Sequence, residues 1–308
     1  MSEPPRDPEQ LGASAEAVRA EIAADAAVGA VHLVVADLAR SLAYYAEAVG
    51  LAVIEREAGC ARVGVGDRAL VVLEEQRGAR RGTGYTGLYH FALLVPERVD
   101  LARWLAHAAR RRVPLAGMAD HFVSEALYLT DPDGHGIEIY WDRPREIWEG
   151  QVAERMTTEP LDTADLLGEL DDPAREPFEA LAPGTVMGHV HLKVAGIAAT
   201  VAFYRDVLGL GLMARLGGRA AFFGAGGYHH HIGANTWESA GAAAPPADVA
   251  RLQHLTIVLP NTAARDAVRA RVEASGVVTR DTERGPLCED PSGNPIVLAV
   301  ADPVAGAA

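Results

Sequence analysis

The stretch VHLVVADLARSLAYYAEAVGL at residues 31–51 recurs at 190–210 as VHLKVAGIAATVAFYRDVLGL, and the two copies align without a gap. The match extends to Tyr45 and Tyr204 and to the Gly-Leu pair that ends each copy. Each copy begins with an apolar run rich in β-branched residues and continues with helical spacing. A repeat of this kind decides the fold of the chain, because each repeated unit is one structural module.

A second repeat alternates with the first. LYHFALLVPERVDLARWLAHAARRRV at 88–113 aligns without a gap with LQHLTIVLPNTAARDAVRARVEASGV at 252–277. Each is followed by an Asp-Pro-x-Gly turn, in which proline fixes φ and glycine takes the strained position. Short β-like runs follow every helical segment. We therefore predict an α+β fold of four βαβββ modules in two pseudo-symmetric halves, with modules one to four numbered in chain order.

The division of the chain follows from the repeat and from composition. The 308 residues are enough for two domains of ordinary size. The stretch between the halves is rich in Pro, Glu and Asp and contains helical fragments such as TADLLGELDD. We expect a lead-in at 1–27, a first domain with modules one and two at 28–141, a linker with helical segments at 142–185, a second domain with modules three and four at 186–300, and a tail at 301–308.

Charge and composition exclude several classes of partner. Lys and Arg total 28 against 42 Asp and Glu, a net charge of −14, which opposes binding to nucleic acids and to anionic membrane surfaces. No stretch has the apolar length of a membrane span or the apolar core of a signal peptide. Two cysteines without CxxC spacing favour a reducing compartment. We expect a cytoplasmic protein, and a homo-oligomer is compatible with the sequence.

One stretch of module two combines several chemical groups around its turn. ADHFVSEALYLTDPDGHGIEIYW at 119–141 contains a histidine, a spacer, an apolar residue followed by Tyr, the Asp-Pro-x-Gly turn and a glutamate. Together with LYHFALLVP at 88–96 and GGYHHHIGANTW at 226–237, it resembles the extradiol ring-cleavage enzymes of the vicinal oxygen chelate superfamily, which include bacterial catechol 2,3-dioxygenases. The resemblance covers residues 28–141 and 186–300, and the one departure from the fingerprint is Ala119. It implies curved mixed sheets in which two modules surround a shared metal cavity.

The resemblance also implies where metal ligands lie, namely on the first strand of the modules and on the last strand of one. Glu138 stands between two isoleucines, so strand alternation lets its carboxylate face the cavity. The equivalent residue of module four is Val297, which cannot bind a metal. The first-strand ligand position falls on Ala30 in module one and on His189 in module three. In modules two and four the position is taken by His90 and His254.

Only one pairing of modules completes a site of two histidines and one carboxylate. Modules two and three together supply His90, His189 and Glu138, whereas modules one and two lack a histidine and modules three and four lack a carboxylate. We therefore infer a metal site shared between the halves. The alternative is that His32 replaces the missing ligand and the amino-terminal half carries the site alone.

The remaining histidines divide into candidates for catalysis and structural residues. The resemblance places His121 and Tyr128 beside the substrate, with Tyr128 as a phenolic donor, and aligns His230 with a catalytic histidine. If His229, His230 and His231 lie on one strand, His230 points opposite to the other two, and alternation alone leaves open which direction is inward. His254 is interpreted as a remnant of a duplicated site or a core histidine. Structural or pocket-lining roles are expected for His32 and His191, and surface positions for His107 and His135.

The function implied is that of an extradiol dioxygenase of aromatic compound catabolism, acting on a small aromatic diol and O2. Fe(II) is the implied cofactor because O2 chemistry needs a redox metal, although Mn(II) suits the same ligands. Two alternatives are a metalloenzyme of the glyoxalase or thiol-transferase kind and a non-catalytic small-molecule binding protein. The histidine-rich ligand set without a second carboxylate favours the dioxygenase.

Overall fold

The computed structural model describes residues 20–301, and the expected lead-in up to residue 19 and tail from residue 302 lie outside this range. The first half contains the two predicted modules. Module one comprises β2 (Val31–Val35), α2 (Leu38–Tyr44) with its π-helical continuation η2 (Tyr45–Val49), β3 (Ala52–Glu57), β4 (Cys60–Val65) and β5 (Arg68–Glu75). Module two comprises β6 (Gly87–Leu94), α3 (Arg98–Arg111), β7 (Gly117–Asp120), β8 (Ser124–Thr130) and β9 (Gly136–Asp142).

The second half repeats this order. Module three comprises β10 (Val186–Lys193), α7 (Ile197–Val201) with η3 (Ala202–Val207), β11 (Gly211–Leu216), β12 (Ala220–Gly224) and β13 (Ile232–Asn235). Module four comprises β14 (Arg251–Leu259), α8 (Thr262–Ala274), β15 (Arg280–Thr282), β16 (Gly285–Glu289) and β17 (Pro295–Val300). The predicted α+β fold of four βαβββ modules is confirmed.

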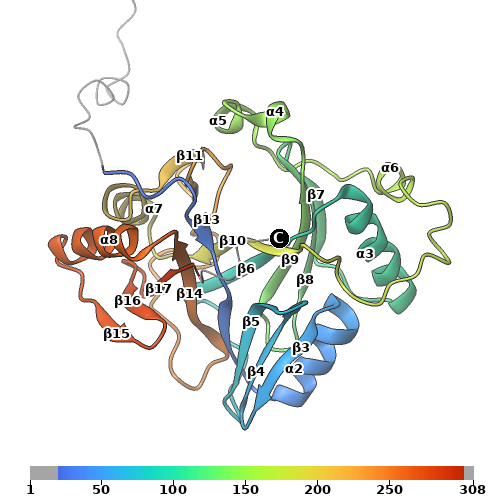
Figure 1. Ribbon diagram of the computed structural model, residues 1–308, viewed down its shortest axis with the longest axis horizontal. Helices are drawn as coiled ribbons and strands as arrows, with labels where there is room; N and C mark the ends of the chain where they lie inside the picture. Colours follow the sequence, from blue (N-terminus) through green and yellow to red (C-terminus); the bar gives the residue numbers. More distant parts are fainter. Residues whose placement is uncertain (1–19, 302–308) are drawn as a thin grey trace, which may run out of the picture.

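Two sheets form the body of the protein, and each takes one module from each half. The first has the strand order β15-β16-β17-β14-β2-β5-β4-β3, with the short β1 (Ala27–Val28) also paired to β14. The second has the order β11-β12-β13-β10-β6-β9-β8-β7. The antiparallel pairs β14–β2 and β10–β6 join the halves, and the module helices lie at the periphery (Figure 1). Module two therefore shares its sheet with module three.

Alternate side chains of β9 point to opposite faces of the sheet, one toward the hydrophobic core and the other toward a cavity. Ile137 and Ile139 are fully buried in the main hydrophobic core. Glu138 between them lines a cavity on the other face of the sheet. This is the arrangement expected from the sequence, and it places a carboxylate between two apolar residues of the strand.

The repeated tyrosines and aspartates hold the two modules of each half together. Tyr45 donates a hydrogen bond to Asp131 of the first Asp-Pro-x-Gly turn over 3.2 Å, and Tyr204 donates to Asp290 of the second turn over the same distance. Both tyrosines lie in π-helical turns. The glycine that follows each turn has a positive φ, +91° at Gly50 and +87° at Gly209, a conformation that favours glycine. The gapless first repeat is thus explained by packing.

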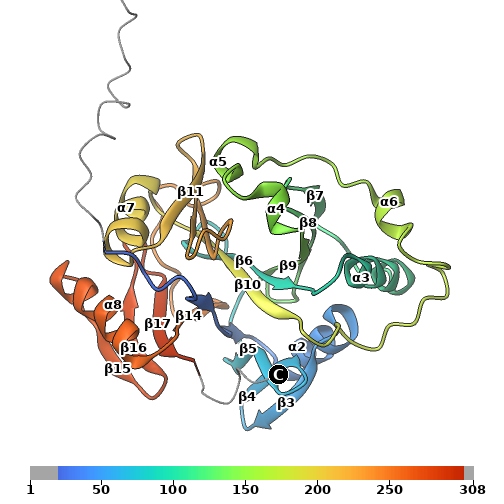
Figure 2. The same cartoon turned by 45° about the horizontal axis from the view of Figure 1, so that its top comes forward.

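The linker between the halves runs along the outside of the second sheet. Its short helices are α4 (Arg145–Trp148), α5 (Val152–Arg155) and α6 (Thr163–Leu167). In both views α4 and α5 lie near one end of this sheet and α6 lies beside α3 (Figures 1 and 2). No helix in residues 20–301 is long and apolar enough to cross a membrane.

Candidate metal centre

Three buried side chains from three adjacent strands converge on the inner face of the second sheet. His90 comes from β6, Glu138 from β9 and His189 from β10, and each is at most 6% exposed. Both imidazole Nε2 atoms approach the same Glu138 oxygen, at 2.9 Å for His90 and 3.1 Å for His189. The two Nε2 atoms are 3.4 Å apart. The structure therefore brings together the three predicted ligands from both halves of the chain.

The distances within this cluster fit a metal ion. Metal–nitrogen and metal–oxygen bonds are about 2.0–2.2 Å long, so neighbouring ligands at right angles lie about 3 Å apart. The three separations of 2.9, 3.1 and 3.4 Å match this spacing. Two imidazoles and one carboxylate on one face of an ion leave the opposite positions free for other ligands.

Burial and charge shift the pKa values of two members of the cluster, Glu138 and His189. Burial alone would raise the pKa of Glu138, but the imidazoles of His189 and His90 hold that pKa well below its usual value. Burial lowers the pKa of His189, against the opposing charge of Glu138. A charged carboxylate beside a neutral imidazole is the form that binds a cation.

A cavity of about 500 Å³ lies beside the cluster. His90 and Glu138 form part of its wall, and the three predicted catalytic residues His121, Tyr128 and His230 line it as well. A volume of this size is ordinary for a small-molecule site. The cluster is therefore accessible to a ligand from one side.

His121 and Tyr128 form a hydrogen-bonded pair at the cavity wall. His121 Nε2 lies 2.7 Å from the Tyr128 hydroxyl, and its Nδ1 lies 2.7 Å from the backbone oxygen of Thr157 in the linker. A carbonyl oxygen only accepts, so Nδ1 carries the proton and Nε2 of the neutral ring accepts from Tyr128. Burial and the charge of Glu138 raise the pKa of Tyr128 well above its usual value, so it is a neutral phenol. In this state Tyr128 donates to His121.

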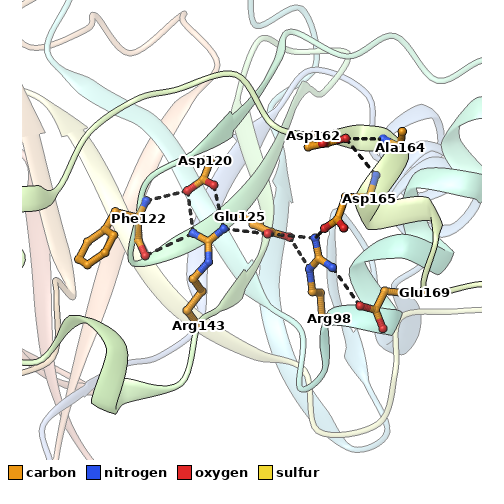
Figure 3. Close-up of polar contacts among 9 residues, drawn as sticks. All are labelled: Arg98, Asp120, Phe122, Glu125, Arg143, Asp162, Ala164, Asp165 and Glu169. Atoms are coloured by element: carbon orange, nitrogen blue, oxygen red, sulfur yellow. Dashed lines mark hydrogen bonds and ion pairs between the residues drawn. The ribbon is translucent and has the colours of Figure 1, made fainter.

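The turn that carries His121 is held in a strained conformation by an arginine. Phe122 has φ +68°, a left-handed conformation unfavourable for a bulky residue. Asp120 accepts from the Phe122 amide and forms a two-pronged ion pair with Arg143, at 2.6 and 2.8 Å. Figure 3 shows Arg143 between Asp120 and the buried Glu125. The strain at Phe122 is thereby offset next to a predicted catalytic histidine.

The same network continues to the linker. Arg98 of α3 binds the other side of Glu125 and donates to Asp165 and Glu169 at α6 (Figure 3). Both arginines thus neutralise one buried carboxylate, which would be costly to bury alone. These contacts fix the α6 end of the linker to α3 and β8.

The triple histidine does not lie on a strand, so the expectation of alternating directions is wrong. His229, His230 and His231 precede β13, in an irregular segment after the turn at Gly226 and Gly227. Inward and outward alternation applies only to extended strands. His230 lines the cavity, with its ring centroid 4.2 Å from that of His189. His229 is fully buried behind it.

A hydrogen-bonded chain reaches His230 from a carboxylate that the sequence reasoning missed. His229 Nε2 donates to Asp142 Oδ1 over 2.8 Å, and in the neutral ring Nδ1 is then an acceptor. His230 Nδ1 lies 2.8 Å from that nitrogen and therefore donates to it. Burial lowers the pKa of His230 well below its usual value, so the ring is neutral and its Nε2 carries no proton. The signal for Asp142 was its place directly after the fingerprint stretch 119–141, at the end of β9.

The first sheet holds a different cluster at the equivalent position. His32 and His254 are stacked with ring centroids 3.8 Å apart, and Arg284 donates to His32 over 2.7 Å. Val297 of β17 stands where β9 has its glutamate. His32 therefore belongs to the first sheet, whereas the three candidate ligands lie on the second.

Two histidines expected at the surface are buried. His107 is 7% exposed, stacks on Phe178 and bonds to the backbone oxygen of Glu47. His135 is 4% exposed and bonds to the backbone oxygen of Val34. Each hydrogen-bond partner belongs to module one, and a contact between modules cannot be identified from local sequence spacing.

A further cavity residue was also missed. Lys193 at the end of β10 lines the cavity together with His191, Trp237 and Glu238. Composition offered a signal, because Lys193 is the only lysine among the 28 basic residues of the chain.

Comparisons with known proteins agree with this architecture. The model of the glyoxalase/bleomycin resistance protein/dioxygenase superfamily matches residues 27–139 and 186–298. A catechol-2,3-dioxygenase of Bacillus subtilis is 40% identical over 275 residues, which cover 87% of this chain and 94% of that protein. Two crystal structures share the fold at 16% identity. One is a Bacillus subtilis protein, with a TM-score of 0.62 and coverage of 92% of this chain and 87% of that chain, and the other is glyoxalase I from Zea mays, with a TM-score of 0.54 and coverage of 89% and 92%. The chain belongs to the glyoxalase/bleomycin resistance protein/dioxygenase superfamily.

Proposed function

We propose that this protein is an Fe(II)-dependent extradiol dioxygenase that inserts O2 into a catechol-like aromatic diol next to the hydroxyl groups. The observation that carries the proposal is the cluster of His90, His189 and Glu138 beside a cavity. The 40% identical catechol-2,3-dioxygenase supports the same reaction class. Mn(II) would suit the same ligands.

The composition of the ligand set favours this function over a glyoxalase-type reaction. The cluster contains two imidazoles and one carboxylate within the described residues. This is the ligand set typical of non-haem Fe(II) oxygenases, whereas we expect a second carboxylate in the isomerases of this fold. Iron bound here would supply free coordination positions for the diol and O2, together with redox capacity.

The protein's own groups then move protons at the substrate oxygens. Tyr128 accepts a proton from a diol hydroxyl as its own proton passes to His121 Nε2, and the Thr157 carbonyl stabilises the resulting imidazolium. This assigns Tyr128 as an acceptor in the resting enzyme, where the sequence suggested a donor. When His121 is protonated the direction reverses, and Tyr128 returns a proton to the product.

His230 lies beside His189, whereas Tyr128 lies beside His90. The proton-free Nε2 of His230 is an acceptor near His189, held by His229 and ultimately by Asp142. A neutral imidazole of this kind takes up a proton during the reaction and returns it later. The two relays enter the cavity from different elements, the linker edge and the segment before β13.

The test is reconstitution with Fe(II) without oxygen, followed by catechol and O2. We expect a yellow ring-opened product, one O2 consumed per diol, and both atoms of labelled O2 in the product. Glu138→Gln and His90→Ala should lose bound iron and product together. The matched control is His254→Gln, which removes an imidazole from the equivalent strand of the other sheet and should retain iron and activity.

Other outcomes would reject the proposal. Conversion of a hemithioacetal by the Zn(II), Ni(II) or Mn(II) form, without diol cleavage by the Fe(II) form, would assign the glyoxalase-type function. Failure to bind any metal, with unchanged ligand binding in His90→Ala, would assign a non-catalytic binding protein.

A further inference from the structure

The inner face of β10 extends from the candidate metal centre along the cavity. His189, His191 and Lys193 alternate with apolar residues on this strand, so all three face the same side. Lys193 lies four positions after His189, a span of about 13 Å at about 3.3 Å per residue. Lys193 therefore marks the end of the cavity farthest from the cluster on this strand.

Lys193 is a cation without a close partner. It forms no ion pair with any carboxylate in the described part of the chain, and Glu238 acts on it only as a more distant charge. Burial lowers the pKa of Lys193, so the charged form lacks part of its hydration. Every other basic residue in the sequence is arginine, yet the one lysine lines this cavity. A partly buried cation of this kind is stabilised by an anion from a ligand.

His191 supplies a second, independent sign that a ligand occupies this path. It is 4% exposed, and its buried Nε2 has no hydrogen-bond partner within residues 20–301. A Cβ at Gly233 would lie 2.8 Å from its Nδ1, so the backbone there makes room for the ring. A buried nitrogen left unpaired costs stability unless a ligand or water satisfies it.

The walls between these polar groups are aromatic. Tyr89 and Trp237 line the cavity with ring centroids 5.4 Å apart, and His191 lies 5.7 Å from Trp237. Rings arranged around a channel favour a flat or alkyl-bearing ligand, with its charged group at the end.

From these observations we infer that the substrate is an aromatic diol with a side chain that ends in a carboxylate, which binds Lys193 while the diol lies at the metal cluster. The inference rests on the proposed dioxygenase function for the diol end of the ligand. The carboxylate end rests on Lys193, His191 and the aromatic walls.

The experiment compares a carboxylic acid with its neutral amide. The iron-loaded protein is titrated without oxygen with 3-(3,4-dihydroxyphenyl)propanoate and with the corresponding amide, and kcat/KM for both is then measured in air. A parallel titration uses 3-phenylpropanoate and its amide with metal-free protein, followed by the fluorescence of Trp237. Trp237→Phe identifies the part of the signal that comes from this residue.

We expect the acid to be preferred about tenfold over the amide in the wild type. Lys193→Met should reduce this ratio to about one, and Lys193→Arg should retain part of it. Arg215→Met is the matched control, because it removes an exposed positive charge from β11 that does not line the cavity, and it should keep the wild-type ratio.

The outcomes separate the two proposals. Equal binding of acid and amide by the wild type, or an unchanged ratio in Lys193→Met, overturns the carboxylate inference even if both diols are cleaved. Preference for 3-phenylpropanoate through Lys193 without cleavage of any diol supports the anion subsite and rejects the dioxygenase function.

Discussion

At the scale of single residues, proton positions in the cavity are determined by groups that can only accept. The Thr157 carbonyl fixes the proton on His121, and the Asp142 carboxylate fixes those on His229 and His230. Neither acceptor touches the candidate metal ligands directly. Outer groups of this kind orient the residues that act on substrate.

Asp142→Asn tests the second relay. An amide can donate to His229 Nε2, which reverses both tautomers and leaves a proton on the cavity side of His230. We expect kcat to fall by about 10- to 100-fold with bound iron unchanged, and the pH dependence of kcat to shift. Glu146→Gln, an exposed carboxylate on α4, is the control. Wild-type kcat in Asp142→Asn would show that the relay has no role.

Gly188 makes room for a tyrosine behind the cluster. A Cβ at this position would lie 1.8 Å from the Tyr140 hydroxyl oxygen, and the Tyr140 ring lies 4.9 Å from that of His189. We expect Gly188→Ala to lower the free energy of unfolding by about 1–3 kcal/mol, measured by urea denaturation. Adding Tyr140→Phe should restore part of the loss. Gly196→Ala is the control, because nothing lies within 4 Å of the added carbon.

At the scale of elements, the same two contacts occur in both halves. A tyrosine in each π-helical turn donates to the aspartate of an Asp-Pro-x-Gly turn. The Oδ1 atom of each aspartate also accepts hydrogen bonds from two backbone amides of its own turn, while Oδ2 accepts from the tyrosine. The turn and the helix are therefore joined by one carboxylate.

Tyr45→Phe and Tyr204→Phe form a matched pair. Each change leaves a buried carboxylate oxygen with fewer donors, so we expect each to lower the free energy of unfolding by about 1–3 kcal/mol. The two losses should add, because the contacts lie in different halves. Denaturation of both single variants and the double variant measures this. A loss in only one variant would contradict the equivalence of the halves.

The stacked pair in the first sheet makes stability depend on pH. Burial, the opposing imidazole and Arg284 lower the pKa of His32 to about 2, and burial and Arg284 lower that of His254 to about 4, from an ordinary value of 6.5. Below pH 6.5 the unfolded chain takes up protons at these residues and the folded protein does not, so acid favours unfolding. Well above that pH the pair contributes no slope.

We therefore expect the free energy of unfolding of metal-free wild type to fall more steeply from about pH 7 to about pH 5 than that of a His32→Gln, His254→Gln double variant. Urea denaturation at each pH measures the difference. Parallel slopes in the two proteins would contradict the lowered pKa values.

At the scale of the whole molecule, the candidate metal centre needs both halves of the chain. β6 and β9 supply two ligands and β10 the third, across the antiparallel β10–β6 pair. Cutting the linker at 171–175 leaves the cavity-lining part of the linker with the first half. We expect the first half alone to bind no Fe(II), and co-expression of the two halves to restore binding, measured as iron per protein. Stoichiometric iron in the first half alone would contradict a shared site.

Much of this architecture was predictable from the sequence, because the repeats can be aligned directly and the alignment shows which modules lack a ligand residue. The contrast of Glu138 with Val297, and of His189 with Ala30, indicated that modules two and three pair, as β6 and β10 do. The conformation of His229–His231 was not predictable, because nothing in the sequence distinguishes an irregular approach to β13 from a longer strand. His135 and Asp142 depend on partners far along the chain, at Val34 and His229, which periodicity does not identify.

Each sheet combines one module from each half of the chain, and this affects how the candidate metal centre and the His32–His254 cluster can change in sequence. A symmetric dimer of two-module chains with this pairing would have two identical sites, and every substitution would occur in both. In this protein the linker joins the two units into one chain, so each site can change by itself. One sheet can keep its ligands while the other replaces a glutamate by valine and a histidine by alanine. Because both units belong to one chain, the two sites can differ in sequence and in role, whereas the sites of a symmetric dimer must be identical.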